Sequence, residues 1–161
     1  ARQGIEYLPE PVDATQVPAH LRGMRTLFEG FHHFRPAEAR AILQDAVEKR
    51  AAIGVFEASL PPLTGPLIFI FSPLMTLLGY LFATPFIKPF RFSRLFWTYL
   101  IPLVPLATIW DGMVSFLRVY SVGELGELVE PLRTPGYTWE IGQASTGTPL
   151  FVFTYLVGYP I

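Results

Sequence analysis

The feature that most limits how this chain can fold is a long segment with almost no charge. Residues 58–87 contain no charged side chain, and neither do residues 95–110. The three charges between the two runs are all positive: Lys88, Arg91 and Arg94. The first run is long enough to cross a bilayer, which takes about 20 helical residues. Prolines interrupt this run, at Pro61, Pro62, Pro66, Pro73 and Pro85.

The second apolar run is shorter. As a straight helix, residues 95–110 would extend roughly 24 Å, less than the ~30 Å of a hydrocarbon core. It also contains Pro102 and Pro105. Two proline-broken apolar runs joined by a basic turn indicate a re-entrant or interfacial hairpin, with residues 62–110 in contact with a membrane. A hairpin of two full spans and a lid buried on the protein are the alternatives, and hydrophobic periodicity does not separate them.

The composition excludes several classes of function. A chain of 161 residues suffices for one domain with a core. Its net charge of -1 gives no attraction to phosphate backbones, so nucleic acid is not expected as a partner. The absence of cysteine excludes disulfides, cysteine-bound zinc and thiol catalysis. Nothing after Ala1 resembles a signal peptide, so we expect a cytoplasmic chain that can associate with a membrane.

Residues 1–57 predict strands on either side of a helix. Ile5–Leu8 and Met24–Phe28 are strand candidates, bounded by prolines and glycines. A helix is expected from Pro36, because proline suits a first helical turn and apolar residues then recur at helical spacing. Ala52–Phe56 is expected to be a buried strand that ends at Glu57. Strand, helix and strand with short connections predict a right-handed parallel crossover.

Residues 111–161 predict a helix and a β-hairpin. Ser121 and Glu124 have the spacing of a capping box, in which a hydroxyl and a carboxylate each satisfy a backbone N–H at the start of a helix. Tyr137–Gln143 and Phe151–Val157 are strand candidates, close enough in sequence to pair as an antiparallel hairpin. The expected order of elements is therefore β, β, α, β, apolar insertion, α, β, β.

Short motifs follow one another in the order seen in a known family. They are VDAT at residues 12–15, TLFEGFHHF at 26–34, IGVFEA at 53–58, LRVYS at 117–121 with Glu124 and Leu125 after it, and PGY at 135–137. Over roughly two-thirds of the chain, this series resembles the second half of the class I S-adenosylmethionine-dependent methyltransferases.

The resemblance implies an α/β fold, the C-terminal half of a three-layer Rossmann-like sheet that ends in an antiparallel hairpin. Residues 1–57 would form the methyltransferase-like core around strands three to five, 58–110 an apolar lid or membrane hairpin, and 111–161 the C-terminal helix and β-hairpin. The family's glycine-rich cofactor turn and the acidic residue that holds the ribose are absent and would lie before Ala1. This polypeptide by itself is therefore expected to bind cofactor poorly and to be inactive.

The resemblance implies S-adenosylmethionine as the cofactor and assigns its adenine side to a few residues. They are Asp13, Ala14, Glu29, Gly30 and Phe31. Asp13 would receive the adenine amino group, and Gly30 would permit close approach of the backbone. Asp before Ala-Thr is also an ordinary turn-forming residue, so both interpretations of Asp13 stay open. No metal site is predicted, because the sequence contains no zinc signature.

His32, His33 and Glu57 are the candidate residues on the acceptor side. His33 is the candidate general base, because histidine exchanges protons near neutral pH, and His32 and Glu57 would contact the substrate. Glu57 ends a strand, where open α/β sheets bind ligands. On a strand the two histidines would face opposite ways and could not chelate one metal. The competing interpretation is structural: one histidine is buried and bonded, the other caps the next helix, and Glu57 is a solvated loop carboxylate.

Two classes of function follow from these observations. The first is methyl transfer from S-adenosylmethionine to a small or lipid-like acceptor. The second is non-enzymatic: a membrane-associated module in which the α/β parts only scaffold the apolar hairpin.

Overall fold

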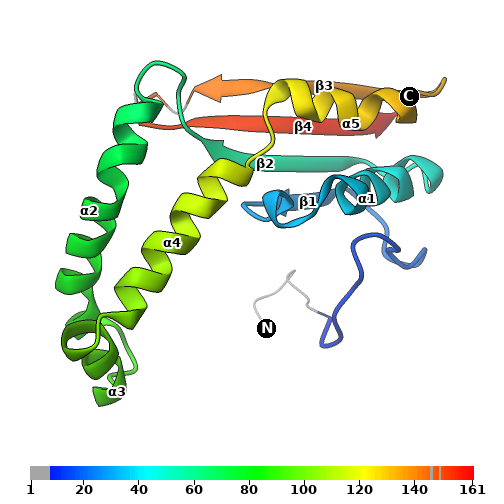
Figure 1. Ribbon diagram of the computed structural model, residues 1–161. Coiled ribbons are helices and arrows are strands. Elements are labelled where there is room, and N and C mark those ends of the chain that lie inside the picture. The colour runs from blue at the N-terminus through cyan, green and yellow to red at the C-terminus, as the bar shows by residue number, and fades with distance from the viewer. Residues whose placement is uncertain (1–7, 146, 149) are drawn as a thin grey trace.

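The computed structural model describes residues 8–145, 147–148 and 150–161, and its centre is a four-stranded sheet in the order β1-β2-β4-β3 (Figure 1). The strands are β1 Arg25–Phe28, β2 Ile53–Ser59, β3 Tyr137–Ser145 and β4 Val152–Pro160. The α-helices are α1 Pro36–Glu48, α2 Gly65–Ala83, α3 Phe92–Leu95, α4 Leu103–Arg118 and α5 Val122–Val129. Short helical turns are η1 Phe31–His33, η2 Thr84–Phe86, η3 Phe96–Leu100 and η4 Glu130–Leu132.

The sheet combines a parallel pair with an antiparallel hairpin. β1 and β2 are parallel, with Phe28 opposite Phe56, and α1 connects them. β4 lies antiparallel between β2 and β3, with Thr154 opposite Glu57. The α/β class, the parallel pair and the terminal hairpin are therefore confirmed. The strand expected over Ile5–Leu8 lies, apart from Leu8, outside the described residues, and Leu8 belongs to no strand.

One face of the sheet is covered by α1 and α5, and the hydrophobic core lies between these two helices and the sheet (Figure 1). α5 begins at the expected capping box: Glu124 N–H donates to Ser121 Oγ at 3.2 Å, and Ser121 N–H donates to the Glu124 carboxylate at 2.8 Å. Apolar residues of both helices meet inward-facing side chains of β2 and β4, and each contributes about 1.5–3 kcal/mol when fully buried. These residues include Ile42, Leu43, Ile53, Val55, Leu125, Val129 and Leu156.

The opposite face of the sheet has no helix over it among the described residues, so they form two layers and not the expected three (Figure 1). Phe28 is 67% exposed on this face and stacks on Phe56 with ring centroids 5.1 Å apart. Phe153 of β4 is exposed on it as well. The helix that follows β2 does not return to cover these rings, because it leaves the sheet altogether.

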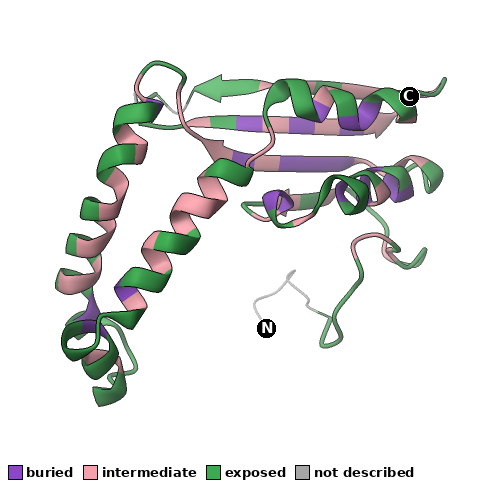
Figure 2. Cartoon of the chain, viewed as in Figure 1, coloured by how far each residue is buried: buried purple, intermediate pink, exposed green. Residues whose placement is uncertain are grey.

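After β2 the chain forms a helical hairpin that projects from one end of the sheet; we call residues 65–118 the hairpin (Figures 1 and 2). α2 and α4 pack against each other along it. α2 is unbroken although Pro73 lies within it, so the interruption expected inside the first apolar run is not observed there. α4 continues past residue 110 to Arg118, so the helical insertion extends further than the segment expected from charge alone.

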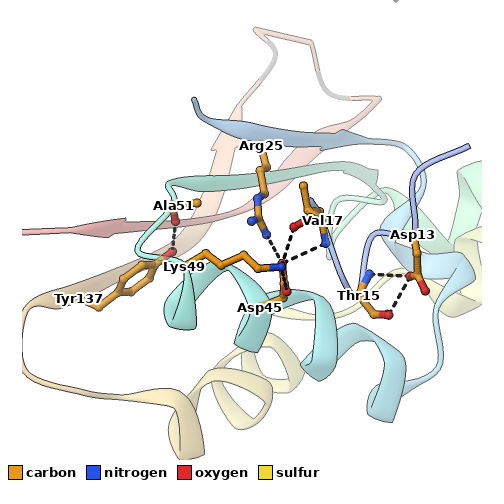
Figure 3. A network of polar contacts seen from close by, with 8 residues as sticks. All are labelled: Asp13, Thr15, Val17, Arg25, Asp45, Lys49, Ala51 and Tyr137. Atoms are coloured by element: carbon orange, nitrogen blue, oxygen red, sulfur yellow. Dashed lines mark hydrogen bonds and ion pairs between the residues drawn. The ribbon is translucent and has the colours of Figure 1, made fainter. Parts of the chain in front are cut away.

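Asp45 of α1 ties the segment before β1 to the core (Figure 3). Its Oδ2 accepts from Arg25 Nη1 at 2.7 Å, and its Oδ1 accepts from Lys49 Nζ at 2.5 Å. Lys49 Nζ also donates to the carbonyl of Val17 at 2.6 Å. Burial raises the pKa of the Asp45 carboxyl, but hydrogen bonds from Lys49 and Arg25 and their positive charges outweigh burial, so the pKa lies below its ordinary value.

Replacing the buried Asp45 by Asn should lower the free energy of unfolding by about 3 kcal/mol at neutral pH, because the half-buried Arg25 then lacks its anion. Since the folded-state pKa of Asp45 is lowered, its stabilisation is present above the unfolded pKa of about 4 and is lost as the pH falls through the folded pKa. Urea unfolding between about pH 2 and pH 7 should show a steeper acid loss in wild type than in Asp45→Asn.

The control for this comparison is Glu48→Gln, an exposed position on the same helix, which should follow the wild-type pH profile. An Asp45→Asn profile parallel to that of wild type would contradict the assigned role of Asp45.

Candidate functional site

A left-handed turn after β1 forms the centre of the site. Glu29 has a φ of 50°, a conformation that costs a non-glycine residue roughly 1–2 kcal/mol. Two hydrogen bonds hold it there: its N–H donates to Phe56 O at 3.0 Å, and its Oε1 accepts from Ala58 N–H at 2.6 Å. The turn redirects the chain so that the N–H groups of Gly30 and Phe31 point toward β2.

Glu57 of β2 receives these N–H groups. Its Oε1 accepts from Gly30 at 2.8 Å and from Phe31 at 2.6 Å, and its Oε2 lies 2.5 Å from His32 Nδ1. Glu57 is 4% exposed, so it is not a solvated loop carboxylate. A carboxylate buried this deeply is stable only when its oxygens are hydrogen-bonded, and three donors from one short segment meet that need.

The contact with Glu57 determines where the His32 ring carries its proton. An ionised carboxylate accepts hydrogen bonds and cannot donate them, so the proton of the neutral imidazole lies on Nδ1. Nε2 then keeps its lone pair and is the ring atom that can take a proton. A carboxylate in this position also stabilises the imidazolium that would form. His32 and Glu57 together can therefore act as an oriented general base.

His33 is placed differently from His32. It is exposed, and in the described part of the chain no carboxylate pairs with it. The expectation that the two rings face opposite ways is wrong, because they lie on the 3-10 turn η1 and not on a strand, with ring centroids 4.2 Å apart. His33 does not cap the next helix either, since the N-cap of α1 is Arg35. Among the described residues no group of three or more His, Asp or Glu could hold a metal.

The candidate base lines a cleft between η1 and the end of α4, with a volume of about 480 Å³. Its walls are His32, His33, Phe34, Arg35, Pro36, Leu117, Arg118, Val119, Tyr120 and Glu124. Tyr120 closes one side: its hydroxyl donates to Phe34 O at 2.8 Å, and its ring packs on Phe31. Burial raises the pKa of the Tyr120 phenol, and the charges of Glu124 and Glu38 raise it further, so the phenol remains a donor at neutral pH.

Tyr120 and Thr154 belong to this region but were not predicted from the sequence. Thr154 is buried opposite Glu57, and its Oγ1 is 2.8 Å from Ser59 Oγ and accepts from Gln143 Nε2 at 3.2 Å. The available signal was alternation: Thr154 is two residues from the buried Leu156, which puts a hydroxyl on the inward face of an apolar strand.

The residues assigned to the adenine side of a cofactor do not form one pocket. Asp13 Oδ1 accepts from the hydroxyl of Thr15 at 2.7 Å and from its N–H at 2.8 Å, and these bonds lower the pKa of Asp13 (Figure 3). Of the two interpretations of Asp13, contact with adenine and an ordinary turn, the structure therefore shows the turn. It lines a hollow of about 240 Å³ formed by residues between Leu8 and Leu21, which includes none of the residues 29–31.

The other four residues assigned to the adenine side contact the hydrophobic core or take part in the hydrogen bonds around the turn after β1. Ala14 packs against the hydrophobic core, and the Glu29 carboxylate bonds Ala58. The N–H groups of Gly30 and Phe31 are occupied by Glu57. The described residues therefore form a cleft that is lined by His32, and they do not bring the residues assigned to the adenine side into one pocket.

Comparison with models of protein families, with curated proteins and with solved structures finds no match to this chain.

Replacing Glu57 by Gln should move the His32 proton from Nδ1 to Nε2. The carboxamide would still accept the N–H of Gly30 and Phe31 through its oxygen, but it would present an NH₂ donor to the ring, so Nδ1 would have to accept. Nitrogen-15 NMR of the imidazole measures this tautomer directly. The His33 signals serve as the internal control, and a His32 ring that keeps its proton on Nδ1 would contradict the assigned pairing.

Proposed function

We propose that this chain forms the acceptor side of a class I S-adenosylmethionine-dependent methyltransferase, with His32 as its general base. The observation that carries the proposal is the arrangement of the strands: a parallel pair, β1 and β2, is continued in one sheet by the antiparallel strands β4 and β3. The motifs that resemble the family imply this combination for its last four strands. The cleft also lies near the carboxyl ends of β1 and β2, where open α/β sheets bind ligands.

The buried dyad supplies chemistry that methyl transfer to a hydroxyl or amine requires. Such an acceptor attacks through a lone pair and loses a proton, and a base placed at that proton contributes roughly 10²–10⁴-fold to the rate. His32 Nε2 is the base atom, because Nδ1 is committed to Glu57. Gly30 and Phe31 hold Glu57 in turn, so the ring is oriented before an acceptor binds.

S-adenosylmethionine would supply an electrophilic methyl group. The described residues do not fit it as a complete site, because Asp13 lines a separate hollow and the sequence has no glycine-rich turn after a strand. Only the acceptor side is therefore assigned to this chain. We expect a donor-binding half to pair with β1. Among the described strands, β1 pairs only with β2, so its other edge is open.

The acceptor that suits the cleft is a small or lipid-like molecule with both polar and apolar parts. Phe34 and Leu117 offer apolar surface, while Arg118 and the Tyr120 hydroxyl offer polar groups. Leu117 and Arg118 are the last residues of α4, so the cleft lies at the end of the hairpin that adjoins the sheet.

A second candidate function is a non-enzymatic, membrane-associated module. The observation that favours it is the exposure of the apolar hairpin, which needs a partner whether or not the cleft is catalytic. Binding of S-adenosylmethionine to the complete natural protein, measured by calorimetry, separates the two candidates. Heat of binding supports the enzyme, and its absence favours the module.

In the complete natural protein, His32→Gln should lower kcat for methyl transfer by roughly 10²–10⁴-fold, because the amide cannot take the acceptor's proton. The loss should fall on kcat, and KM should change much less. Transfer of a radiolabelled methyl group measures both effects.

His33→Gln is the matched control, since it changes the neighbouring exposed ring and leaves the pairing with Glu57 intact. Loss of activity in His33→Gln with full activity in His32→Gln would return the base role to His33.

A further inference from the structure

We infer that the hairpin crosses a lipid bilayer and that its basic tip, residues 87–94, reaches the headgroups of the far leaflet. The sheet and the cleft then lie at the near leaflet. This inference concerns the surroundings of the hairpin and does not depend on methyl transfer.

The length and exposure of α2 match a membrane span. α2 and η2 run together from Gly65 to Phe86, 22 residues, which extend about 33 Å at 1.5 Å per residue. A hydrocarbon core is ~30 Å thick. The most apolar window of this helix has a mean hydropathy of 1.9, and only 6% of it is buried inside the protein. The core helix of a soluble protein would be mostly buried, so α2 needs another apolar environment.

α4 returns beside α2, and both helices expose apolar side chains. The 16 residues of α4 extend about 24 Å. α3 and η3, residues 92–100, lead into α4 from the tip, and the chain bends by 73° between residues 92–100 and α4. Figure 2 shows that the hairpin is almost entirely exposed or half-buried, in contrast to the middle of the sheet. The exposed side chains include Leu67, Ile70, Phe71, Leu74, Leu78, Phe82, Leu103, Leu106 and Trp110. Continuous apolar surface of this extent marks contact with a partner or a membrane.

Three hydroxyl groups of the hairpin donate to backbone carbonyls within it, as a hydrocarbon environment favours. Pro73 has no N–H to offer the carbonyl of Phe69, four residues earlier, and the Ser72 hydroxyl donates to that carbonyl instead, at 3.0 Å. The hydroxyls of Thr84 and Thr108 donate to the carbonyls four residues before them, at 2.6 and 3.0 Å. These bonds need no water, so they persist in lipid.

The polar side chains within α2 all lie on its less exposed face, among apolar ones. Ser72, Thr76 and Tyr80 follow one another at helical spacing on α2 and are half-buried, as are Thr108 and Gly112 on α4. Small and hydroxyl-bearing residues are enriched where membrane helices pack together. An exposed face without polar side chains, as on α2, is the reverse of the pattern in a water-soluble helix.

Charge distinguishes a full crossing from a shallower insertion. If the tip stopped inside the hydrocarbon, Lys88, Arg91 and Arg94 would each be unfavourable there, by translocon scales for charged residues at the centre of a span. In a full crossing these three residues meet the far headgroups, and Asp111 is left as the one charged residue between Leu95 and Leu117. One buried charge is less unfavourable than three, so the crossing is favoured. A hairpin lying flat on the surface would leave much of the apolar outer face of α2 in water.

Aromatic residues gather next to the basic tip. Phe90, Phe92, Trp97 and Tyr99 are exposed there. Tryptophan and tyrosine, the residue types of Trp97 and Tyr99, are enriched where membrane helices meet the headgroups. Their position supports an interface at the tip and not halfway along the hairpin.

The three tryptophans of the chain are natural depth probes. Trp97 lies in η3 near the tip, Trp110 in the middle of α4 and Trp139 in β3. Three variants, each keeping one tryptophan and carrying Phe at the other two positions, are reconstituted into vesicles of phosphatidylcholine and phosphatidylglycerol. Quenching by lipids with a spin label in the headgroup or at mid-chain reports depth. We expect Trp110 to respond most to the mid-chain label, Trp97 most to the headgroup label, and Trp139 least to either.

Each other result would overturn the inference. Strongest mid-chain quenching of Trp97 would mean that the tip stops in the hydrocarbon. Headgroup quenching of both Trp97 and Trp110 would mean that the hairpin lies flat. Failure of the folded chain, verified by circular dichroism, to float with the vesicles would exclude membrane insertion altogether.

A matched pair of variants provides a second measurement. Leu74→Arg places a charge midway along the exposed outer face of α2, and should weaken partition into vesicles by roughly 100-fold. Leu63→Arg changes an equally apolar, exposed residue just before α2, and should leave partition near the wild-type value. Equal partition of the two variants would contradict a buried position for Leu74.

Discussion

The hydrogen bonds of one buried carboxylate, Glu57, connect the parts of this chain that matter for a function. Glu57 accepts from the N–H groups of Gly30 and Phe31 and from the ring of His32, so it joins the turn after β1 to the middle of the sheet. Because an unpaired carboxylate is costly to bury, the strained turn at Glu29 and the 3-10 turn after it must adopt one geometry. The contact that closes this end of the core also orients a base.

The hairpin and the sheet differ in where their apolar side chains lie. The core between α1, α5 and the sheet buries apolar side chains, as water requires, whereas α2 and α4 expose theirs. The two regions meet at the cleft, whose walls come from residues 32–36 and from residues 117–120 at the end of α4. A bilayer around the hairpin would place this cleft at the headgroup layer, within reach of amphiphilic molecules.

Local patterns predicted most of the elements. The helix start at Pro36, the capping box of Ser121 and the hairpin of the last two strands each depend on residues near one another in the sequence, and each was found where expected. The break expected within α2 was not found, because Ser72 replaces the hydrogen bond that Pro73 removes. The third layer was not found among the described residues, because the helix after β2 turns away from the sheet.

The sequence by itself determined the helices α1 and α5, the four strands of the sheet and which segment is apolar, since these properties arise from neighbouring residues and from period. Only the tertiary structure decided that His32, and not His33, meets a carboxylate, because the partners lie 25 positions apart and the turn between β1 and α1 sets the ring directions. It also decided that Asp13 closes its own turn and that the apolar segment stays uncovered by the rest of the described chain. Those outcomes depend on how distant segments pack, which no local pattern contains.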